Sequence, residues 1–362
     1  MLRVAAPEYP IDTPALIVDA GILLANIRRM AGFFAGRPAK LRPHFKTHKT
    51  PAIAHLQLQH GAIGITCAKL GEAEVLVHAG IRDVLIANQV TAPAKVARLA
   101  GLAHIAHLKV CVDDEENLLA LSRAAVAAGS RIGVLVEVDV GMGRSGTRSA
   151  PATLRLAARA ASLPGIDFQG VMGYEGHAVF RASREDREAA CRAANACLLD
   201  HAAAVRQEDI PCPLVSAGGT GTYDISGDCP GITEVEAGSY VFMDATYRKI
   251  VPEFATALTA LATVISRPEP SRAVIDLGMK AVTGEFGLPQ PEGLPGATTL
   301  ALSEEHGVLE LEGPARDLRV GDQVVLLPTH CCTTVNLHDR LHVSRGGRVQ
   351  DVWTIAARGA FC

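Results

Sequence analysis

Residues 108–138 read LKVCVDDEENLLALSRAAVAAGSRIGVLVEV, and this stretch decides the fold. Two short apolar runs rich in valine, 108–112 and 134–138, stand at its ends. Between them, residues 115–128 repeat their apolar side chains every three to four positions, which is the period of a helix with one buried face. A strand, a helix and a strand in this order predict a βαβ unit with two parallel strands.

The same alternation extends from about residue 39 to about residue 240. Strands are expected at 41–45, 63–67, 84–87, 108–112, 134–138, 168–173, 214–217 and 233–237. Helices are expected at 70–79, 92–102, 115–128, 152–161 and 184–206. Eight such units match a (β/α)8 barrel, for which about 250 residues are typical. An open, doubly wound sheet is the rival fold, and the count of eight favours the barrel.

After about residue 250 the helical period fades, and short strand-like runs separated by Gly and Pro take over. Strands are expected at 256–265, 273–277, 307–311, 323–327, 341–343 and 349–355. We therefore expect an α/β barrel domain over residues 12–249 and an all-β C-terminal domain over 250–362, together with residues 1–11. A further run, 14–19, is a candidate to pair with the C-terminal domain, and Asp19 is a candidate cap for the helix after it.

Composition narrows the class of protein. The 362 residues are 48% hydrophobic, and the net charge of -3 provides no basic surface for nucleic acid or anionic lipid. Neither a signal-peptide pattern nor a bilayer-length apolar segment is present in the sequence. Of the nine cysteines, Cys67 and Cys111 lie inside apolar runs, so they predict buried thiols rather than a disulfide framework. We expect a soluble, cytoplasmic protein with a small-molecule partner.

The carboxyl end of the first expected strand carries Lys46, between His44 and His48. Active sites of (β/α)8 barrels lie at the carboxyl ends of the strands. A lysine there is a candidate for Schiff-base chemistry, because desolvation lowers the pKa of an amine and makes it nucleophilic. The alternative is a surface lysine in a basic turn, and this residue alone leaves both interpretations open.

The seventh strand ends in Gly218, Gly219, Thr220 and Gly221. Barrel phosphate sites commonly use the loops after strands seven and eight, and glycine amides with a hydroxyl suit a phosphate. The alternative is an ordinary tight turn, but the position in the strand order favours phosphate. No G-x-G-x-x-G follows the first strand, which disfavours a nicotinamide cofactor. Arg144, in the loop after the fifth strand, is a candidate to bind a cofactor oxygen or to form a loop salt bridge.

A second group of chemically active side chains lies near the C-terminus, where His330 and Cys332 stand two residues apart. On an extended segment such residues face the same side, whereas Cys331 would face the other. An imidazole and a thiolate could bind one divalent ion, with zinc favoured and manganese as the alternative. Two protein ligands would leave room for water and substrate. The rival interpretation is a buried histidine beside a core cysteine.

These motifs, in this order, resemble the D-threonine aldolase and D-serine dehydratase family, whose barrel domain is similar to that of alanine racemase. The resemblance covers nearly the whole chain. Its segments are 12–15, 42–49, 139–146, 218–221, 238–244, 305–307, 330–337 and 353–359.

The resemblance implies a pyridoxal 5′-phosphate cofactor held by Lys46 as a Schiff base and a divalent metal in the active site. It also implies a homodimer whose C-terminal domain helps to close the site. The phosphate would bind near Gly219, Thr220 and residues 238–240. The predicted cofactor-binding residues are Lys46, Arg144, Tyr174, Gly218, Gly219, Thr220, Gly221, Gly238, Ser239 and Tyr240.

Two reactions on a 3-hydroxy D-amino acid compete within this resemblance. Residues 238–244 and 356–359 look like the aldolase branch, but aldolases typically carry Asp where this chain has Cys332. In the dehydratase reaction Lys46 removes the α-proton and the metal helps the hydroxyl to leave. In the aldolase reaction His177 or a metal-bound water deprotonates the hydroxyl, releasing glycine and an aldehyde. Cys332 favours the dehydratase; a non-catalytic pyridoxal-phosphate carrier and a racemase are further alternatives.

Overall fold

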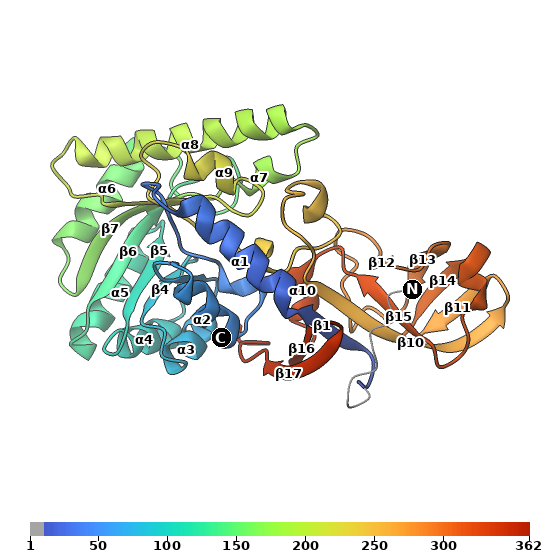
Figure 1. Ribbon diagram of the computed structural model, residues 1–362. Helices are drawn as coiled ribbons and strands as arrows, with labels where there is room; N and C mark the ends of the chain where they lie inside the picture. The colour runs from blue at the N-terminus through green and yellow to red at the C-terminus, as the bar shows by residue number, and fades with distance from the viewer. Residues whose placement is uncertain (1–10) are drawn as a thin grey trace. The chain divides into compact units, whose positions relative to one another are not determined.

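The computed structural model describes residues 11–362 (Figure 1). Contacts between residues divide the chain into two compact units, each drawn from separate parts of the chain. The barrel unit holds Met30–Lys46, Ile53–Gly238 and Ala360–Cys362, and the β-rich unit holds Thr47–Ala52, Ser239–Gly359 and the chain up to Arg29. The single boundary expected after residue 249 stays a prediction. The expected place of residues 1–10 in the β-rich domain lies outside the described residues.

The barrel unit contains one parallel sheet of eight strands, in the order β2-β9-β8-β7-β6-β5-β4-β3. The strands are β2 Lys40–Leu41, β3 Ile65–Cys67, β4 Asp83–Ile86, β5 His107–Val112, β6 Ile132–Glu137, β7 Ile166–Met172, β8 Leu214–Ala217 and β9 Glu234–Val235. Backbone hydrogen bonds from Ile63 N to Leu41 O (3.0 Å) and from Thr66 N to Pro43 O (2.9 Å) join the two ends of this sheet. The sheet therefore closes on itself, which confirms the predicted (β/α)8 barrel.

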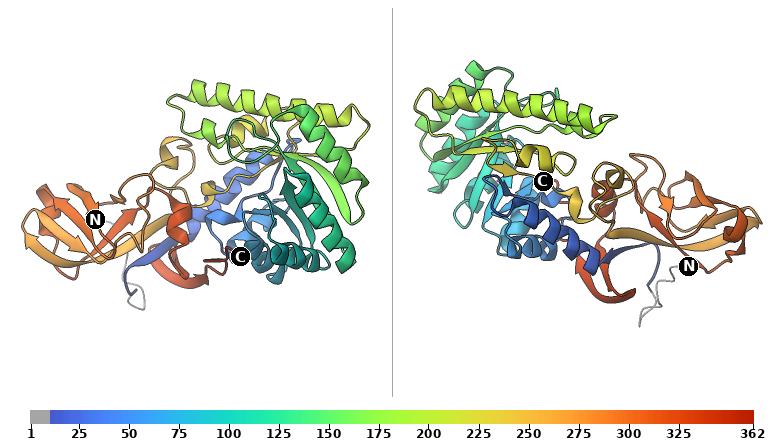
Figure 2. Two further views of the ribbon diagram at one scale, coloured as in Figure 1. Left: turned by 180° about the vertical axis from the view of Figure 1, so that it is seen from behind. Right: turned by 45° about the horizontal axis from the view of Figure 1, so that its top comes forward.

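Helices cover the outer side of this sheet (Figures 1 and 2). They include α2 Pro51–Gln59, α3 Leu70–His78, α4 Pro93–Leu102, α5 Glu115–Ala128, α6 Ala150–Ser162, α7 Gly176–Val179, α8 Arg184–Arg206 and α9 Tyr223–Gly227. The bounds predicted for α5 are confirmed. The helix begins there because Asp114 caps its first turn by accepting from Asn117 N at 3.0 Å. At the other end Gly129 takes the left-handed conformation, with φ 65°, that ends many helices. Helices α2, α7 and α9 were not expected.

The barrel interior is filled by side chains. Leu85, Cys111, Leu135 and Met172 come from four neighbouring strands and form one buried apolar cluster. Both cysteines expected to be buried, Cys67 and Cys111, are fully buried and free. The interior is thus a packed core, and chemistry is confined to the two ends of the barrel.

The β-rich unit is built on one sheet in which β1 (Ala15–Asp19) lies antiparallel to β10 and parallel to β16. The expected pairing of run 14–19 with the C-terminal strands is therefore confirmed. Asp19 also caps α1 (Ala20–Phe34) as expected, since its Oδ1 accepts from Ile22 N at 2.9 Å. The remaining strands are β10 Leu258–Glu269, β11 Arg272–Ile275, β12 Gln290–Pro291, β13 Ala297–Leu302, β14 Gly307–Leu311, β15 Gln323–Leu327, β16 Arg340–Arg345 and β17 Arg348–Thr354.

Two features of this unit differ from the expectation. Strands β12 and β13 were not expected, because residues 290–296 mix Pro, Gly and polar residues and residues 297–302 show no regular alternation of apolar and polar side chains. The extended segment expected at 330–332 is wrong beyond His330: residues Cys331–Val335 form the helix α10, and His330, with φ −143° and ψ 114°, precedes its first turn. Across residues 11–362, no helix has the length and apolarity needed to cross a bilayer.

Candidate active site

Lys46 lies in a 3-10 turn, Phe45–Thr47, that follows the first barrel strand, β2. Phe45 is fully buried and anchors this turn, whereas the side chain of Lys46 is exposed. The Lys46 ammonium lies 5.7 Å from the centre of the Tyr174 ring, which follows β7. Lys46 N also donates to Nδ1 of His44 at 3.3 Å. The carboxyl ends of two barrel strands thus bring the amine to an aromatic face, where a cation is attracted.

The glycine-rich loop after β8 lies against the same tyrosine. A Cβ added to Gly219 would lie 3.1 Å from Cε2 of Tyr174. Gly218 has φ 78°, a left-handed conformation that favours glycine, and a Cβ there would lie 2.8 Å from Cγ1 of Val235. Thr220 is buried. The structure therefore brings Lys46, Tyr174 and the predicted phosphate loop together at one end of the barrel unit.

Glu175 holds this loop in place, and sequence reasoning missed it. Its Oε2 accepts from Gly218 N at 3.1 Å, and its Oε1 accepts from the hydroxyls of Thr222 (2.7 Å) and Ser226 (2.9 Å). Gly219 N donates to the Thr222 hydroxyl at 3.2 Å. The signal in the sequence was an acidic residue directly after a strand end, beside Tyr174.

His177 lies in α7 and packs against the loop after β6. A Cβ on Gly141, whose φ is 124°, would lie 2.9 Å from Nε2 of His177, so this close approach depends on glycine. His177 Nδ1 is buried and has no hydrogen-bond partner among the described residues. The loop itself is held by Asp139, which accepts from Gly141 N (3.1 Å) and Gly143 N. Arg144, in the same loop, is exposed, and no ion pair of its side chain is found within residues 11–362.

The predicted metal pair lies in the β-rich unit. His330 Nδ1 is 2.7 Å from Oε2 of Glu285, and the His330 ring stacks on Phe286 with the ring centres 4.5 Å apart. Cys332 Sγ lies 3.3 Å from the Thr47 hydroxyl and 3.7 Å from the Ser239 hydroxyl. Thr47 and Ser239 directly follow Lys46 and Gly238 in the chain.

The electrostatics of this pair favour a thiolate. Hydrogen bonding from Cys331 lowers the pKa of the Cys332 thiol well below its ordinary 9.0; burial opposes this, and His330 adds to the lowering. Burial lowers the pKa of His330, but Cys332 and Glu285 outweigh it and raise that pKa to about 9. A metal ion that binds here would displace the proton that His330 holds at this pKa, and the resulting pair of thiolate and imidazole is a donor set that suits zinc. The described part of the chain contains no group of three or more His, Cys, Asp or Glu side chains that could hold a metal ion. The predicted site would therefore have two protein ligands.

Two further predicted residues, Ser239 and Tyr240, begin the segment of the β-rich unit that follows β9. Ser239 is beside Cys332, as described above. Tyr240 is fully buried, and its ring centre lies 5.8 Å from that of Phe254. Its side chain therefore packs against the core of the β-rich unit, and its role in binding the phosphate stays a prediction.

Two family models match the chain in succession. The alanine racemase N-terminal domain matches residues 18–246, and the putative serine dehydratase domain matches residues 257–344. The chain belongs to the alanine-racemase-like family of D-threonine aldolases and D-serine dehydratases. This family consists of pyridoxal-phosphate-dependent lyases, which confirms the enzyme class expected from the sequence.

Relatives of both reaction types are found in this family. The chain is 43% identical to D-threonine aldolase of Arthrobacter sp over 98% of this chain and 94% of that one. It is 38% identical to 3-hydroxy-D-aspartate aldolase of Paracoccus denitrificans (97% and 93% covered) and 31% identical to D-threo-3-hydroxyaspartate dehydratase of Delftia sp. (90% and 92%).

Solved structures of family members match the whole fold. The crystal structure of D-threonine aldolase from Filomicrobium marinum has a TM-score of 0.95 at 38% identity, with 99% of each chain covered. A cysteine-to-alanine mutant of D-threo-3-hydroxyaspartate dehydratase, in the metal-free form, has a TM-score of 0.85 at 29% identity, with 95% of this chain and 97% of that one covered.

A second buried carboxyl that was not singled out from the sequence is Glu236, one residue beyond β9. It is 9% exposed and accepts from the Ser216 hydroxyl at 2.7 Å. Burial, partly opposed by that hydrogen bond, raises the pKa of Glu236 to about 8. Lys46 is among the charges that act on it. The signal was the spacing of Glu234 and Glu236, since side chains two residues apart on an extended segment face the same side.

Replacing Glu236 with glutamine should flatten the pH dependence of stability. The folded chain holds this proton with a pKa of about 8 against an ordinary value of 4.5, so it binds the proton more tightly than the unfolded chain does. Stability is therefore lost as the pH rises from 4.5 to about 8, by at most about 1.4 kcal/mol per pH unit. Urea unfolding of the cofactor-free chain across this window measures the slope, and equal slopes for wild type and Glu236→Gln would contradict the assignment.

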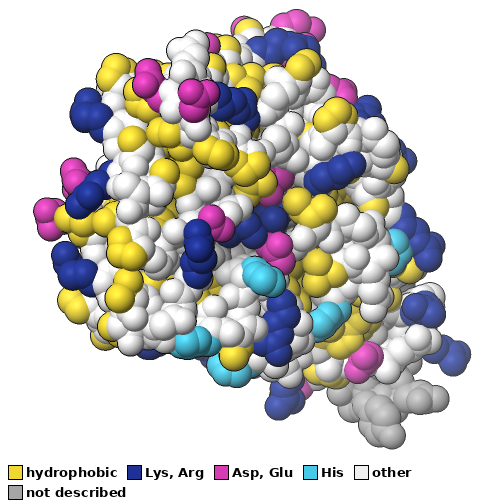
Figure 3. All heavy atoms as spheres, turned by 90° about the vertical axis from the view of Figure 1, so that its left-hand side faces the viewer, with side chains coloured by type: hydrophobic (Ala, Val, Ile, Leu, Met, Phe, Trp, Pro, Cys, Tyr) yellow, Lys and Arg dark blue, Asp and Glu magenta, His cyan; other side chains and the backbone are white. Residues whose placement is uncertain are grey.

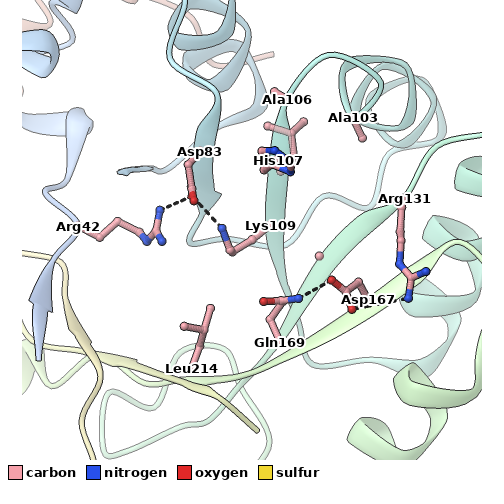
Figure 4. A pocket seen from close by; sticks show the side chains of 12 residues that line it. Arg42, Asp83, Ala103, Ala106, His107, Lys109, Arg131, Asp167, Gln169 and Leu214 are labelled. Atoms are coloured by element: carbon pink, nitrogen blue, oxygen red, sulfur yellow. Dashed lines mark hydrogen bonds and ion pairs between the residues drawn. The ribbon is translucent and has the colours of Figure 1, made fainter. Parts of the chain in front are cut away.

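The opposite end of the barrel carries a polar pocket of about 520 Å³, but its charges are already paired (Figure 4). Asp83 lies 2.5 Å from the Arg42 guanidinium and 2.8 Å from the Lys109 ammonium, and Arg42 also pairs with Glu234 at 2.9 Å. Asp83 and Glu234 begin their strands, at the end of the barrel opposite Lys46, where barrel residues commonly serve stability rather than catalysis. Acidic, basic and histidine side chains also lie next to one another on the face seen in Figure 3. The pocket is thus an ion-paired closure of the barrel.

Proposed function

We propose that the protein is a pyridoxal-phosphate- and metal-dependent lyase that cleaves 3-hydroxy D-amino acids by retro-aldol reaction into glycine and an aldehyde. The observation that carries the cofactor assignment is Lys46 at the first strand end, 5.7 Å from the ring of Tyr174, which itself packs on the glycine loop. A nucleophilic amine and a phosphate-type loop at one barrel mouth are the two parts that this cofactor needs.

The residues present fit the cofactor. Lys46 would hold it covalently, and the amide of Gly221, which has no acceptor within the described residues, would face its phosphate together with Thr220. Gly218 N and Gly219 N donate to Glu175 and Thr222, so these two amides support the loop rather than the ligand. When bound, pyridoxal phosphate supplies the electron sink for the carbanion that bond cleavage leaves.

The metal assignment rests on donor chemistry. A thiolate at Cys332 and an imidazole at His330 would hold one divalent cation, zinc or manganese, and leave its other positions to water and substrate. A metal there would polarise the substrate hydroxyl. Two mutants of a D-threo-3-hydroxyaspartate dehydratase replace a histidine and a cysteine that are also two residues apart in that protein, and the structure of the cysteine mutant is of the metal-free form.

His177 is the base that we assign to the reaction. Retro-aldol cleavage requires removal of the proton from the β-hydroxyl as the carbon–carbon bond breaks, and an imidazole is the side chain best suited to this at neutral pH. His177 lies in the turn after Tyr174, and its Nδ1 has no partner among the described residues. We further propose that the protein is a homodimer, as its family resemblance implies, and that it is cytoplasmic, which its free cysteines favour.

We rank the aldolase reaction first, although Cys332 by itself favours the dehydratase. Identity of 43% over nearly the whole chain to an aldolase outweighs one ligand position, because the surroundings of the substrate depend on many residues. The dehydratase stays the second candidate, and the observation that favours it is the His330 and Cys332 pair. A non-catalytic cofactor carrier is disfavoured, because that pair and the β-rich unit would then have no task.

Product analysis separates the two reactions. The purified protein, with cofactor and zinc or manganese supplied, is incubated with D-threonine, D-serine and both D-3-hydroxyaspartate diastereomers. We expect glycine and an aldehyde in equal amounts from D-threonine or D-3-hydroxyaspartate. Ammonia and a 2-oxo acid instead would replace the aldolase assignment by the dehydratase, and turnover of none of the four would favour the carrier.

A further inference from the structure

Glu175 is a buried carboxylate for which the reaction proposed above provides no role. It is 1% exposed and forms no ion pair within residues 11–362. All its contacts are with neutral donors: the amide of Gly218, the hydroxyls of Thr222 and Ser226, and the thiol of Cys191 at 3.6 Å. Burial and the charge of Glu175 raise the pKa of Cys191 to about 12, so this thiol keeps its proton. A buried carboxylate without a cation is costly and is tolerated where its donors are fixed.

The contacts of Glu175 fix the glycine loop at three points. Gly218 begins the loop, Thr222 ends it, and Ser226 belongs to α9, which follows. Thr222 extends this control, because its hydroxyl accepts from Gly219 N while donating to Glu175. One carboxylate therefore fixes two consecutive loop amides, Gly218 N directly and Gly219 N through Thr222, whereas the amide of Gly221 has no acceptor within the described residues.

The same residue also fixes the neighbouring turn. The backbone oxygen of Glu175 accepts from Ala178 N at 2.9 Å, which starts the helix that carries His177. A Cβ on Gly221 would lie 2.6 Å from Cγ1 of Val179 in this helix, so loop and helix are in close contact. Glu175 therefore contacts the loop with its side chain and supports, with its backbone, the helix that packs against the same loop.

We propose that Glu175 is a positioning residue that sets the affinity of the barrel mouth for the phosphate group of pyridoxal phosphate by holding residues 218–222 in their binding conformation. This inference rests on the proposed function and adds the side chain on which phosphate recognition depends. Glutamine at this position keeps the shape but presents one acceptor oxygen where the carboxylate presents two. At least one loop donor then loses its acceptor, and the loop conformation is no longer fixed.

The test compares two ligands that differ only in the phosphate. The full-length chain, freed of cofactor, is titrated with pyridoxal phosphate and with pyridoxal, and the ratio of the two dissociation constants is measured. For Glu175→Gln we expect the affinity for pyridoxal phosphate to fall roughly tenfold or more, while that for pyridoxal changes by less than about twofold. Thr222→Val, which removes the hydroxyl between Gly219 N and Glu175, should shift the ratio in the same direction.

A matched control is Glu72→Gln. Glu72 is also 1% exposed, and it accepts from the amides of Ala68 and Lys69 at the start of α3. This variant should keep the wild-type ratio. If Glu175→Gln leaves the ratio of the two dissociation constants unchanged, the inference is wrong while the proposed function stands. If Glu175→Gln does not fold, the ratio measured for Thr222→Val decides. A wild-type chain that binds neither ligand would instead refute the proposed function, and the inference with it.

Discussion

Replacing Lys46 by alanine will lower kcat/KM by roughly four orders of magnitude or more and will remove covalent cofactor binding. The side chain is exposed at the barrel mouth and its neighbour Phe45 anchors the turn, so the loss of the amine leaves the packing intact. The cost therefore falls on chemistry rather than on folding. Rates with the best substrate, together with the absorbance of bound cofactor, measure both effects.

Lys40→Ala is the matched control for this variant. Lys40 is an exposed lysine six residues earlier, at the start of β2, and its ammonium donates to the backbone oxygen of Arg37. It lies at the amino end of its strand, whereas Lys46 follows the carboxyl end. We expect Lys40→Ala to keep wild-type activity and cofactor binding. A Lys46→Ala protein with more than about a tenth of wild-type activity would mean that another group performs this role.

Replacing Cys332 by alanine will weaken metal binding by roughly 100-fold or more and will abolish activity at micromolar metal. Cys332 is one of the two protein ligands that we propose for the metal, and its lowered pKa favours the thiolate form, which binds metals. Removing the metal from the wild type with a chelator should have the same effect, reversed by zinc or manganese. Metal content by mass spectrometry and activity against metal concentration measure the two losses.

Cys331→Ala distinguishes loss of a ligand from loss of a thiol. Cys331 is fully buried, and its backbone amide donates to Asp244 at 3.0 Å, a bond that alanine keeps. Because alanine also removes the hydrogen bond by which Cys331 lowers the pKa of Cys332, we expect metal binding to weaken, but by less than in Cys332→Ala, and turnover to be kept at saturating metal. Activity in the wild type that a chelator leaves unchanged would remove the metal from the proposed mechanism.

The barrel could be predicted from the sequence because its strands and helices follow local rules. Asp114 and Gly129 mark both ends of α5, and the apolar runs identify all eight strands. The length of the first strand could not be predicted from the sequence. Residues 41–45 were expected to be extended, but β2 ends at Leu41 and a 3-10 turn begins at Phe45. That turn is fixed by the burial of Phe45, a tertiary effect that a periodic pattern does not contain.

The candidate site was predictable in part, for two different reasons. Lys46 and the glycine loop follow from the rule that barrel chemistry gathers at strand ends. The pair of His330 and Cys332 was proposed for a wrong reason, since alternation along an extended segment does not apply to a residue in α10. Glu175 and Glu236 could not be identified, because a carboxylate after a strand has many uses and only the packed structure shows which donors surround it.

The most direct measurement is reduction of the cofactor-loaded protein with borohydride, followed by peptide mapping. The account predicts one modified peptide, carrying the pyridoxyl group on Lys46. A label on another lysine, or no stable label at all, would contradict the central claim that this residue holds the cofactor.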